Sequence, residues 1–363
     1  MMGSPLLRLI LVSAFACAMA SIAPFALAAP ADARAEKPAL SQYRVLERTT
    51  EPLLVSDRPH EDFCIAYGNV IREGKLWRMW YTAYDHTYQD DRDACLCYAF
   101  SHDGVHWEKP NLGMHDYDGN RDNNILMTGK KVGGLHGQYV FVDPQAPATE
   151  RYKMVYSTLR DGKWIVFGAH SIEGIAWFFR KEPLLKFNSD TQTVCLPDEK
   201  LYRLYVRMWT GDDYKGLRSV GYSESKTFGN FTPPVQILAP DANDPANTDF
   251  YNNAVTRVAA GRYLMFPSAF HHGKIEDGKD VVLPHLATSR DGRNFTRVGR
   301  EPLVQLGKGF DSKGIYVLPG AVPGDRPGTW WFYYLGTNVG HDQHMPKNVR
   351  NSGGIGRFLL SVE

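Results

Sequence analysis

The sequence predicts an all-β protein built as a single-domain, five-bladed β-propeller. Three observations carry this prediction: a turn motif that recurs along the chain, an aromatic strand that recurs five times, and a composition with 12% aromatic residues, 33 Gly and 22 Pro. Repetition at intervals of several tens of residues is typical of propellers and solenoids, and short strands with frequent turn signals favour the propeller. An ordinary β-sandwich with similar turns is the alternative interpretation.

The N-terminal segment predicts export from the cytoplasm. Arg8 precedes a mostly apolar stretch at 9–25, and Ala26-Leu27-Ala28 offers a small-x-small cleavage site. A membrane anchor is the alternative, but serines and a proline interrupt the stretch, and no later segment approaches the length of a membrane span. We therefore expect a secreted or periplasmic protein with a signal peptide at 1–28, a flexible leader at 29–42 and the propeller at 43–363.

Charge and cysteine content narrow the partners and the chemistry. The net charge of +1 indicates neither nucleic acid nor an anionic membrane surface as a partner. After the signal peptide the chain has Cys64, Cys95, Cys97 and Cys195, an even number in a compartment that permits disulfides. Their pairing does not follow from the sequence, although residues two apart in a strand share a face, which disfavours a Cys95–Cys97 bond. The oligomeric state does not follow from it either.

The recurring turn defines one repeat unit of the fold. Residues 101–107 (SHDGVHW) recur as 171–177 (SIEGIAW) and 289–295 (SRDGRNF), with a looser copy at 223–231. The acidic residue is expected to bond local backbone, while the glycine adopts a φ that is costly for other residues. The aromatic residue that ends each copy is expected to pack between blades.

An aromatic strand lies upstream of each turn and sets the number of blades. Its copies stand at 76–81, 152–156, 202–206, 263–266 and 330–334. One copy per blade predicts five blades of short antiparallel strands. We also expect the strand after Gln42 to pair with the C-terminal strand at 356–360 and so close the ring.

The repeat also carries a family resemblance. The string at 98–110 (YAFSHDGVHWEKP), with its partner SRDG at 289–292, resembles the five-bladed propeller glycosidases related to glycoside hydrolase families 32, 43 and 68. The resemblance covers roughly residue 44 to the C-terminus and implies a propeller that hydrolyses glycosidic bonds. The chain lacks the Trp-Met-Asn-Asp-Pro-Asn box of the invertase branch, so a fructosidase is not expected.

The inner strands of the blades nominate the active site. In a propeller these strands line the central channel, so residues at their starts converge from distant parts of the chain. We expect inner strands at about 65–71, 137–142, 191–196, 251–257 and 315–322. The residues at or just before these starts are Asp62, His136, Asp190, Asp249 and Asp311.

Glycoside hydrolysis needs two carboxyl groups that flank the scissile bond, and a third can raise the pKa of the acid. Asp62, Asp190 and Asp249 are the predicted catalytic residues, although an aspartate before a strand is also a common turn residue. The related families place a base or nucleophile in the first blade, an Asp in the second and a Glu acid in the third. Asp62 matches the first position, whereas His136 and Asp190 replace the other two. We expect hydrolysis of plant or algal oligo- or polysaccharides.

Sugar binding calls for aromatic faces and polar donors. Trp209 and Arg207 are candidates for this role. Alternatively, Trp209 could pack between blades, and Arg207 could form a surface ion pair. Glu61, adjacent to Asp62, competes with it for the first-blade role. The predicted substrate-binding residues are Glu61, His136, Arg207, Trp209, Tyr251, Asn252, His271 and Asp311.

The histidines do not predict a metal cofactor. Adjacent residues His271 and His272 would point to opposite faces of a strand, and the pair His341 and His344 lacks a third evident ligand. No cofactor is therefore expected, while a single central cation stays an open alternative.

Two other functions remain open. A catalytically inert propeller could use the same acidic residues to bind sugar hydroxyls. A lyase could use His136 and Tyr251 as base and acid on a uronate, with Arg207 or Lys313 on its carboxylate. A sialidase is disfavoured because its arginine triad is not evident.

Overall fold

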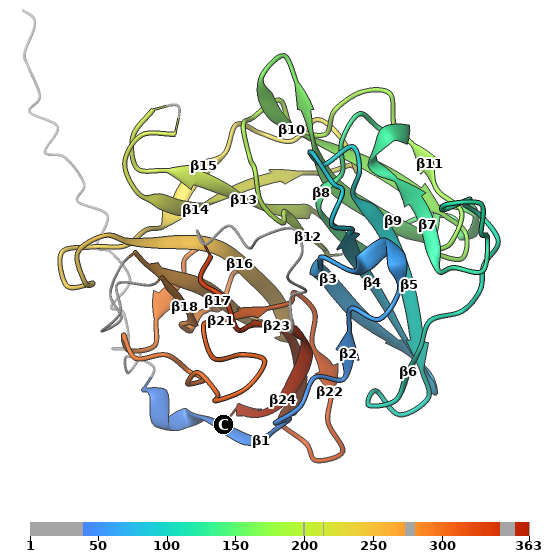
Figure 1. Ribbon diagram of the computed structural model, residues 1–363. Coiled ribbons are helices and arrows are strands. Elements are labelled where there is room, and N and C mark those ends of the chain that lie inside the picture. Colours follow the sequence, from blue (N-terminus) through green and yellow to red (C-terminus); the bar gives the residue numbers. More distant parts are fainter. Residues whose placement is uncertain (1–38, 199, 213, 273–279, 342–352, 363) are drawn as a thin grey trace, which may run out of the picture. The chain divides into compact units, whose positions relative to one another are not determined.

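The computed structural model describes residues 39–198, 200–212, 214–272, 280–341 and 353–362. The predicted signal peptide and most of the predicted leader lie outside these residues. The described residues belong to one compact unit, Pro38–Glu363, which is shown in Figure 1. In the described part of the chain no helix has the length and apolar character needed to cross a membrane.

Three sheets follow one another along the first two thirds of the chain, each starting with the strand that precedes the aromatic strand. The first contains β3 Cys64–Glu73, β4 Leu76–Tyr84, β5 Cys95–Ser101, β6 Trp107–Glu108 and β7 Ile125–Thr128. The second contains β8 His136–Val142, β9 Tyr152–Arg160, β10 Lys163–Ser171 and β11 Phe178–Phe179. The third contains β12 Val194–Pro197, β13 Tyr202–Trp209, β14 Arg218–Ser225 and β15 Val235–Leu238.

The remaining strands form a larger sheet in two parts joined by a single parallel pair, Val282 with Gly314. One part has β16 Thr248–Ala259, β17 Arg262–His271, β18 Val281–Pro284, β19 Ala287–Ser289 and β20 Thr296–Arg297. The other has β21 Gly314–Val317, β22 Val322–Pro323, β23 Thr329–Thr337, β24 Gly354–Val362, β1 Tyr43–Arg48 and β2 Leu54–Val55. The only helical elements of the described residues are the 3-10 turns Leu40–Gln42, Pro59–Glu61, Gly129–Lys131 and Ala148–Glu150. The all-β prediction is confirmed.

The five predicted aromatic strands are all present, within β4, β9, β13, β17 and β23. Three predicted inner strands agree with β3, β8 and β16, which are slightly longer than expected. The third begins at Val194 rather than at Thr191. Gln192, which precedes it, makes side-chain hydrogen bonds to other segments, because its amide donates to the carbonyl oxygens of Gly68 and Gln138. The fifth is divided into β21 and β22.

The predicted turn chemistry is confirmed in three copies. Gly104, Gly174 and Gly292 have φ values of +73°, +79° and +74°, a region that L side chains rarely adopt. In the first copy Asp103 Oδ1 accepts hydrogen bonds of 2.8 Å from the backbone N–H groups of Val105 and His106. These bonds satisfy turn donors that would otherwise depend on solvent.

Each of these turns is held by an aromatic side chain from a neighbouring sheet. Trp80 on β4 donates to the carbonyl oxygen of Gly174 at 2.7 Å, and Tyr205 on β13 donates to that of Gly292 at 2.6 Å. The ring that ends each motif joins the same contacts. The Trp107 ring, for example, lies 5.7 Å from that of Tyr333 on β23. Packing of these rings between sheets was predicted and is confirmed.

The first and last described strands pair with each other. β1 runs antiparallel to β24, with Tyr43 opposite Val362 and Arg48 opposite Phe358. The predicted pairing of the two terminal strands is therefore confirmed. Figure 1 shows β1 and β24 adjacent at the lower edge of the view.

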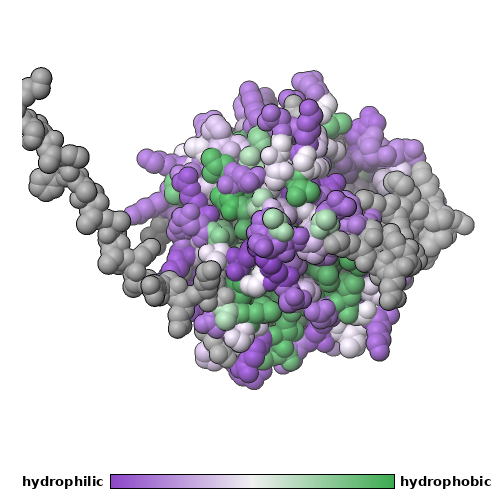
Figure 2. All heavy atoms as spheres, turned by 90° about the vertical axis from the view of Figure 1, so that its left-hand side faces the viewer, coloured by the Kyte–Doolittle hydropathy of each residue, from purple (hydrophilic) through white to green (hydrophobic). Residues whose placement is uncertain are grey.

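The interior is apolar and its cysteines are reduced. Large side chains such as Trp80, Phe266 and Phe332 are at most 1% exposed, and each contributes about 1.5–3 kcal/mol through burial. The four cysteines of the described residues are free thiols, so the disulfides that their even number allows are not present among these residues. Figure 2 shows a face on which hydrophilic side chains surround smaller hydrophobic areas.

Candidate active site

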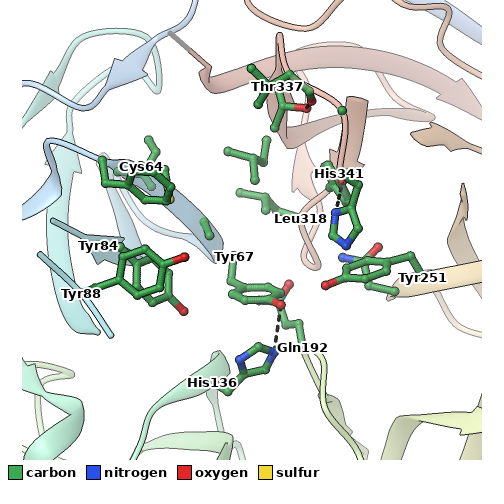
Figure 3. Close-up of a pocket in the computed structure, with 18 of the residues that line it drawn as sticks. Cys64, Tyr67, Tyr84, Tyr88, His136, Gln192, Tyr251, Leu318, Thr337 and His341 are labelled. Carbon is green, nitrogen blue, oxygen red and sulfur yellow. Dashed lines mark hydrogen bonds between the residues drawn. The ribbon is translucent and has the colours of Figure 1, made fainter. Parts of the chain in front are cut away.

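A cavity of about 610 Å³ lies where the inner strands meet. Its lining comes from β3, β4, β8, β16, β21 and β23, from Gln192 just before β12, and from loop residues such as Tyr88 and His341. It combines tyrosine and histidine rings with the side-chain amides of Gln192 and Asn252. Figure 3 shows these side chains projecting into one space from strands that are distant in the sequence. This convergence is what the inner-strand argument predicts.

Irregularities in three inner strands direct side chains into the cavity. The register of β3 shifts between Ala66 and Asn69, that of β8 between His136 and Tyr139, and that of β16 between Phe250 and Asn253. A bulge bends its strand and re-aims a side chain, and bulges are frequent beside active sites. The shifted segments supply Tyr67, His136 and Tyr251 to the lining.

Tyr67 is held in an unusual backbone conformation. Its φ is +49°, which is a true outlier for a bulky residue and costs about 1–3 kcal/mol. Gly68 follows with φ +124°, and a Cβ there would meet the Trp80 carbonyl oxygen at 2.6 Å. The close approach of β4 to Gly68 therefore requires glycine at this position.

The Tyr67 hydroxyl belongs to a chain of three groups. Its oxygen lies 2.9 Å from Nε2 of His136, and Nδ1 of His136 lies 3.0 Å from Oδ2 of Asp91. Tyr84 donates to the other oxygen of Asp91 at 3.0 Å. Because a carboxylate only accepts, Nδ1 carries the histidine proton, which leaves the Nε2 lone pair to accept from the Tyr67 hydroxyl.

Burial governs the ionisation of Tyr67. Its pKa is raised well above the ordinary value, first by burial and then by the nearby Tyr251, while the cation of Arg207 acts in the opposite direction. The side chain keeps some accessible surface inside the cavity. At neutral pH the Tyr67 hydroxyl is therefore protonated, and it donates that proton to Nε2 of His136.

Tyr251 packs against Arg207, whose side chain is 2% exposed. The guanidinium lies 4.3 Å from the centre of the Tyr251 ring and donates through Nε to the Tyr251 carbonyl oxygen at 3.0 Å. Its Nη1 donates to Oδ1 of Asp190 at 2.9 Å. Arg207 is thus neither a surface residue nor a lining residue of the cavity. Its guanidinium packs on the Tyr251 ring and has Asp190 as its counterion.

The other two predicted catalytic aspartates are also held by cationic partners or by histidine. Asp249 accepts from Nη1 of Arg218 at 2.6 Å and lies 3.0 Å from Nε2 of His272. Asp62 accepts from the backbone N–H of His86 at 2.9 Å, and its other oxygen lies 2.6 Å from Nδ1 of the same residue.

The structure brings part of the predicted site together. Of the predicted residues, His136, Tyr251 and Asn252 line the cavity. Within the described part of the chain, Asp62, Asp190 and Asp249 are not among the lining residues. They stand one or two residues before Phe63, Gln192 and Tyr251, which are.

Glu61 and Asp311 lie in buried ion pairs away from the lining. Glu61 is 0% exposed, in the 3-10 turn Pro59–Glu61 rather than in extended backbone, and it accepts from Lys109 and from the Tyr81 hydroxyl at 2.9 Å. Burial raises its pKa while Lys109 opposes the shift. Asp311 pairs with Arg48 and accepts from the Tyr334 hydroxyl at 2.8 Å.

The remaining predicted binding residues have local partners. His271 Nδ1 lies 2.8 Å from the Thr248 hydroxyl oxygen. Trp209 lies 5.3 Å from the Tyr214 ring, and the Arg218 guanidinium lies 5.0 Å from the Trp209 ring. Asn252, which lines the cavity, accepts from the Ser268 hydroxyl.

His341 contributes a neutral imidazole to the cavity. Its Nδ1 lies 2.8 Å from the Tyr316 hydroxyl oxygen, and its ring centre lies 4.1 Å from that of Tyr251. Burial, followed by the cations of Arg207 and Arg218, lowers the pKa of His341 to about 4. Among the described residues no three His, Cys, Asp or Glu side chains gather as possible metal ligands, and His344 lies outside those residues.

Sequence reasoning missed Tyr67, Asp91 and His341 as members of the site. A glycine inside a strand pattern indicates a bulge or a close backbone approach, so Gly68 beside Tyr67 was an available signal. Asp91 carried no comparable signal, because it lies in a loop between β4 and β5. Only the fold brings that loop to His136.

Comparison with known proteins identifies solved structures with a similar fold. No protein-family model matches this sequence, and no curated protein matches it. An N-acetylgalactosamine deacetylase from F. plautii, solved with blood group B trisaccharide, is 15% identical with a TM-score of 0.57, over 86% of this chain and 95% of that one. The catalytic domain of the Coprinopsis cinerea GH62 alpha-L-arabinofuranosidase is 14% identical, with a TM-score of 0.56 over 87% and 97%.

A third solved structure comes from work on the GH130 family of mannoside phosphorylases and its glycoside hydrolases that target beta-1,2 mannosidic linkages in Candida mannan. It is 14% identical with a TM-score of 0.56, and the match covers 90% of this chain and 94% of that one. The low identities show that what is shared is the backbone arrangement. The chain therefore has the fold of the β-propeller-type glycoside hydrolases, at a large distance in sequence.

Proposed function

We propose that this protein is a glycoside hydrolase that binds and cleaves carbohydrate in the central cavity. One observation carries the proposal: in a fold shared with glycoside hydrolases, inner strands from the whole chain supply aromatic rings, amides and titratable groups to a single cavity of about 610 Å³. A concave site with a few convergent polar groups is the usual form of a small-molecule site. Tyrosine faces suit the apolar faces of sugar rings, and the amides suit their hydroxyls.

The blade count of five belongs to the same proposal. Each of the three sheets and each part of the larger sheet contains one inner and one aromatic strand. The two parts of the larger sheet share only the Val282–Gly314 pair, which supports treating them as separate blades. An experimental structure that places six blades around the cavity, or two stacked sheets, would contradict this proposal.

Asp62, Asp190 and Asp249 are the proposed catalytic carboxylates. They precede cavity-lining segments of three different inner strands, and hydrolysis needs an acid and a base or nucleophile on either side of the scissile bond. Each lies beside His86, Arg207 or Arg218 respectively, so substrate must approach a carboxylate that already has a partner.

The test is a product analysis on the mature chain. It is incubated with plant and algal oligosaccharides, and the masses of the products are measured. Products whose combined mass exceeds that of the substrate by one water establish hydrolysis. Asp62→Asn, Asp190→Asn and Asp249→Asn are then compared as folded proteins. At least one is expected to lose several orders of magnitude in turnover with little change in binding. Near-normal activity in all three would refute the carboxylate assignment.

Elimination is the second candidate, because the titratable groups that line the described cavity are tyrosines, histidines and Cys64 rather than carboxylates. His136 with a tyrosine could remove a proton next to a uronate carboxylate, and the leaving oxygen would depart with formation of a double bond. The same incubation separates the two reactions. An unsaturated product without added water indicates a lyase, and binding without any product indicates an inert carbohydrate-binding propeller.

Export to the periplasm or medium is proposed on the N-terminal sequence alone. The expected mature N-terminus lies near Ala29. N-terminal sequencing of protein from the cell envelope and medium tests this, and an intact Met1 there would contradict it.

A further inference from the structure

We propose that Tyr67, His136 and Asp91 form a proton relay in which the Tyr67 hydroxyl takes the proton from the group that reacts in the cavity. The inference rests on the proposed function and deepens it, because it names the general base. It adds Tyr67 and Asp91 to the predicted residues and gives His136 a defined task.

Hydrogen-bond geometry sets the direction of proton movement. Both oxygens of Asp91 act as acceptors, one for Tyr84 at 3.0 Å and one for Nδ1 of His136 at 3.0 Å. The imidazole therefore presents an unprotonated Nε2, at 2.9 Å from the Tyr67 oxygen. A proton that reaches Tyr67 can be passed inward, and the imidazolium that results lies beside a carboxylate. Figure 3 shows the Tyr67 ring within the cavity, linked to His136 by this bond.

The two proton carriers are rigidly positioned by their neighbours. Nε2 of Gln192 donates to the Gly68 and Gln138 carbonyl oxygens, both at 2.8 Å, and so ties the bulge of β3 to that of β8. Asn69 donates to the Val140 carbonyl oxygen at 2.8 Å and accepts from the Val140 N–H at 2.9 Å. These bonds join the strands that carry Tyr67 and His136.

Steric packing allows the bulges little freedom to relax. A Cβ at Gly137 would meet the backbone nitrogen of Gln192 at 2.6 Å, and one at Gly68 would meet the Trp80 carbonyl oxygen at the same distance. The positive φ of Tyr67 persists within this packing. Strained residues that the surroundings hold in place cluster at active sites. The strain thus supports a role for Tyr67 independently of the hydrogen bonds.

The step can be written with atoms and charge in balance. A water O–H bond breaks and its proton bonds to the Tyr67 oxygen, while the original Tyr67 proton moves to Nε2 of His136. The hydroxide oxygen bonds to the anomeric carbon, and the bond from that carbon to the leaving oxygen breaks. The leaving oxygen takes a proton from one of the proposed carboxyl groups. Afterwards the imidazolium returns its proton to solvent and the carboxylate regains one.

The test uses the full mature chain with the substrate found in the product screen. Tyr67→Phe removes the proton carrier and keeps the ring, and His136→Asn keeps a donor toward Asp91 but removes the Nε2 base. We expect kcat to fall by about 10²- to 10⁴-fold in each, with little change in KM. Tyr156→Phe, at a buried tyrosine on β9 outside the described lining, is the matched control and should leave turnover unchanged.

A second measurement does not depend on activity. Long-range ¹H–¹⁵N spectra of the folded protein report which nitrogen of His136 carries the proton. We expect protonation at Nδ1, and a shift of the Nε2 resonance in Tyr67→Phe. This pattern supports the relay even if no glycoside is cleaved. In that case the proposed function is wrong, but the hydrogen-bonded chain of Tyr67, His136 and Asp91 is supported. A proton on Nε2, or near-wild-type kcat in a folded Tyr67→Phe variant, would overturn the relay.

Discussion

The Tyr333 hydroxyl donates a 2.7 Å hydrogen bond to the carbonyl oxygen of Gly104, 229 residues earlier in the chain. It joins β23 to the first copy of the repeated turn. Trp80 and Tyr205 make the equivalent bonds to Gly174 and Gly292. Elsewhere this type of hydrogen bond joins one sheet to the next sheet along the chain. Here it joins the last aromatic strand to the first copy of the turn.

Tyr333→Phe tests the energy of this contact. The substitution removes one of two donors to the buried Gly104 carbonyl oxygen, which keeps the 3.1 Å bond from Nη1 of Arg357, so we expect the free energy of unfolding to fall by about 0.5–1.5 kcal/mol. Urea denaturation at neutral pH measures the change. Tyr205→Phe, which loses the equivalent bond to Gly292, should show a loss at least as large. Two variants as stable as the parent would show that these bonds contribute little.

Gly104→Ala tests the steric side of the same turn. The alanine would adopt φ +73° with its Cβ 2.6 Å from the Tyr333 hydroxyl oxygen, so both backbone strain and a clash oppose it. Gly113→Ala is the matched control, because its φ is +67° with no heavy atom within 4 Å of the added Cβ. We expect about 1–2 kcal/mol of destabilisation in the control and a larger loss in Gly104→Ala. Equal losses would mean that Tyr333 yields without cost.

Asp190→Asn is expected to affect stability as well as turnover. Asp190 is the counterion of Arg207, whose side chain is 2% exposed, and removing one partner of a buried pair costs about 3–5 kcal/mol. The measurement is the free energy of unfolding in urea. Asp62→Asn is the comparison, since its partner His86 is 54% exposed and the loss there should be small. If both variants unfold at the same urea concentration, Arg207 has another adequate partner.

Buried histidines predict acid sensitivity. The pKa of His60 is lowered to about 4 by burial and then by Lys109 and Arg58, and that of His285 is lowered to about 4 by burial and Arg297. The unfolded chain binds these protons near pH 6.5, so the stabilising contribution is present above that pH and is lost as the pH falls toward 4. We expect the free energy of unfolding to drop by a few kcal/mol between pH 7 and 5.

A His60→Gln variant identifies the source of that pH dependence. Glutamine can keep a hydrogen bond to Asn124 but does not titrate, so the drop in unfolding free energy between pH 7 and 5 should become smaller. A His106→Gln variant is the control, because the His106 side chain is 87% exposed and its removal should leave the drop unchanged. An unaltered pH dependence in His60→Gln would contradict the assignment.

The free thiols give a chemical prediction. Cys64, Cys95, Cys97 and Cys195 are unpaired, so a reducing agent should leave the melting temperature unchanged. Peptide mapping without reduction, after alkylation in denaturant, should find all four modified by the alkylating reagent. A crosslinked peptide pair would show that oxidation rearranges this part of the core.

The repeated turns and strands could be predicted from the sequence because each depends on residues that are close together in the chain. An acidic residue and a glycine specify the turn at 101–107, and alternating aromatic residues specify strands such as β4. The composition of the cavity was less accessible. Asp190 and Asp249 were placed by counting back from strands, and that argument gives chain position but not side-chain direction. A bulge such as the one at Tyr67 reverses the direction that alternation predicts.

The pairing of β1 with β24 has a consequence for synthesis. At about 5–20 residues per second, the roughly 300 residues between the two strands keep β1 without its partner for about 15–60 seconds. Throughout that interval β1 is an unsatisfied edge that other strands could capture. Strand β1 can pair with β24 only after the ribosome has completed the chain. Protection of the nascent chain from aggregation therefore matters most for β1, the first strand to be synthesised.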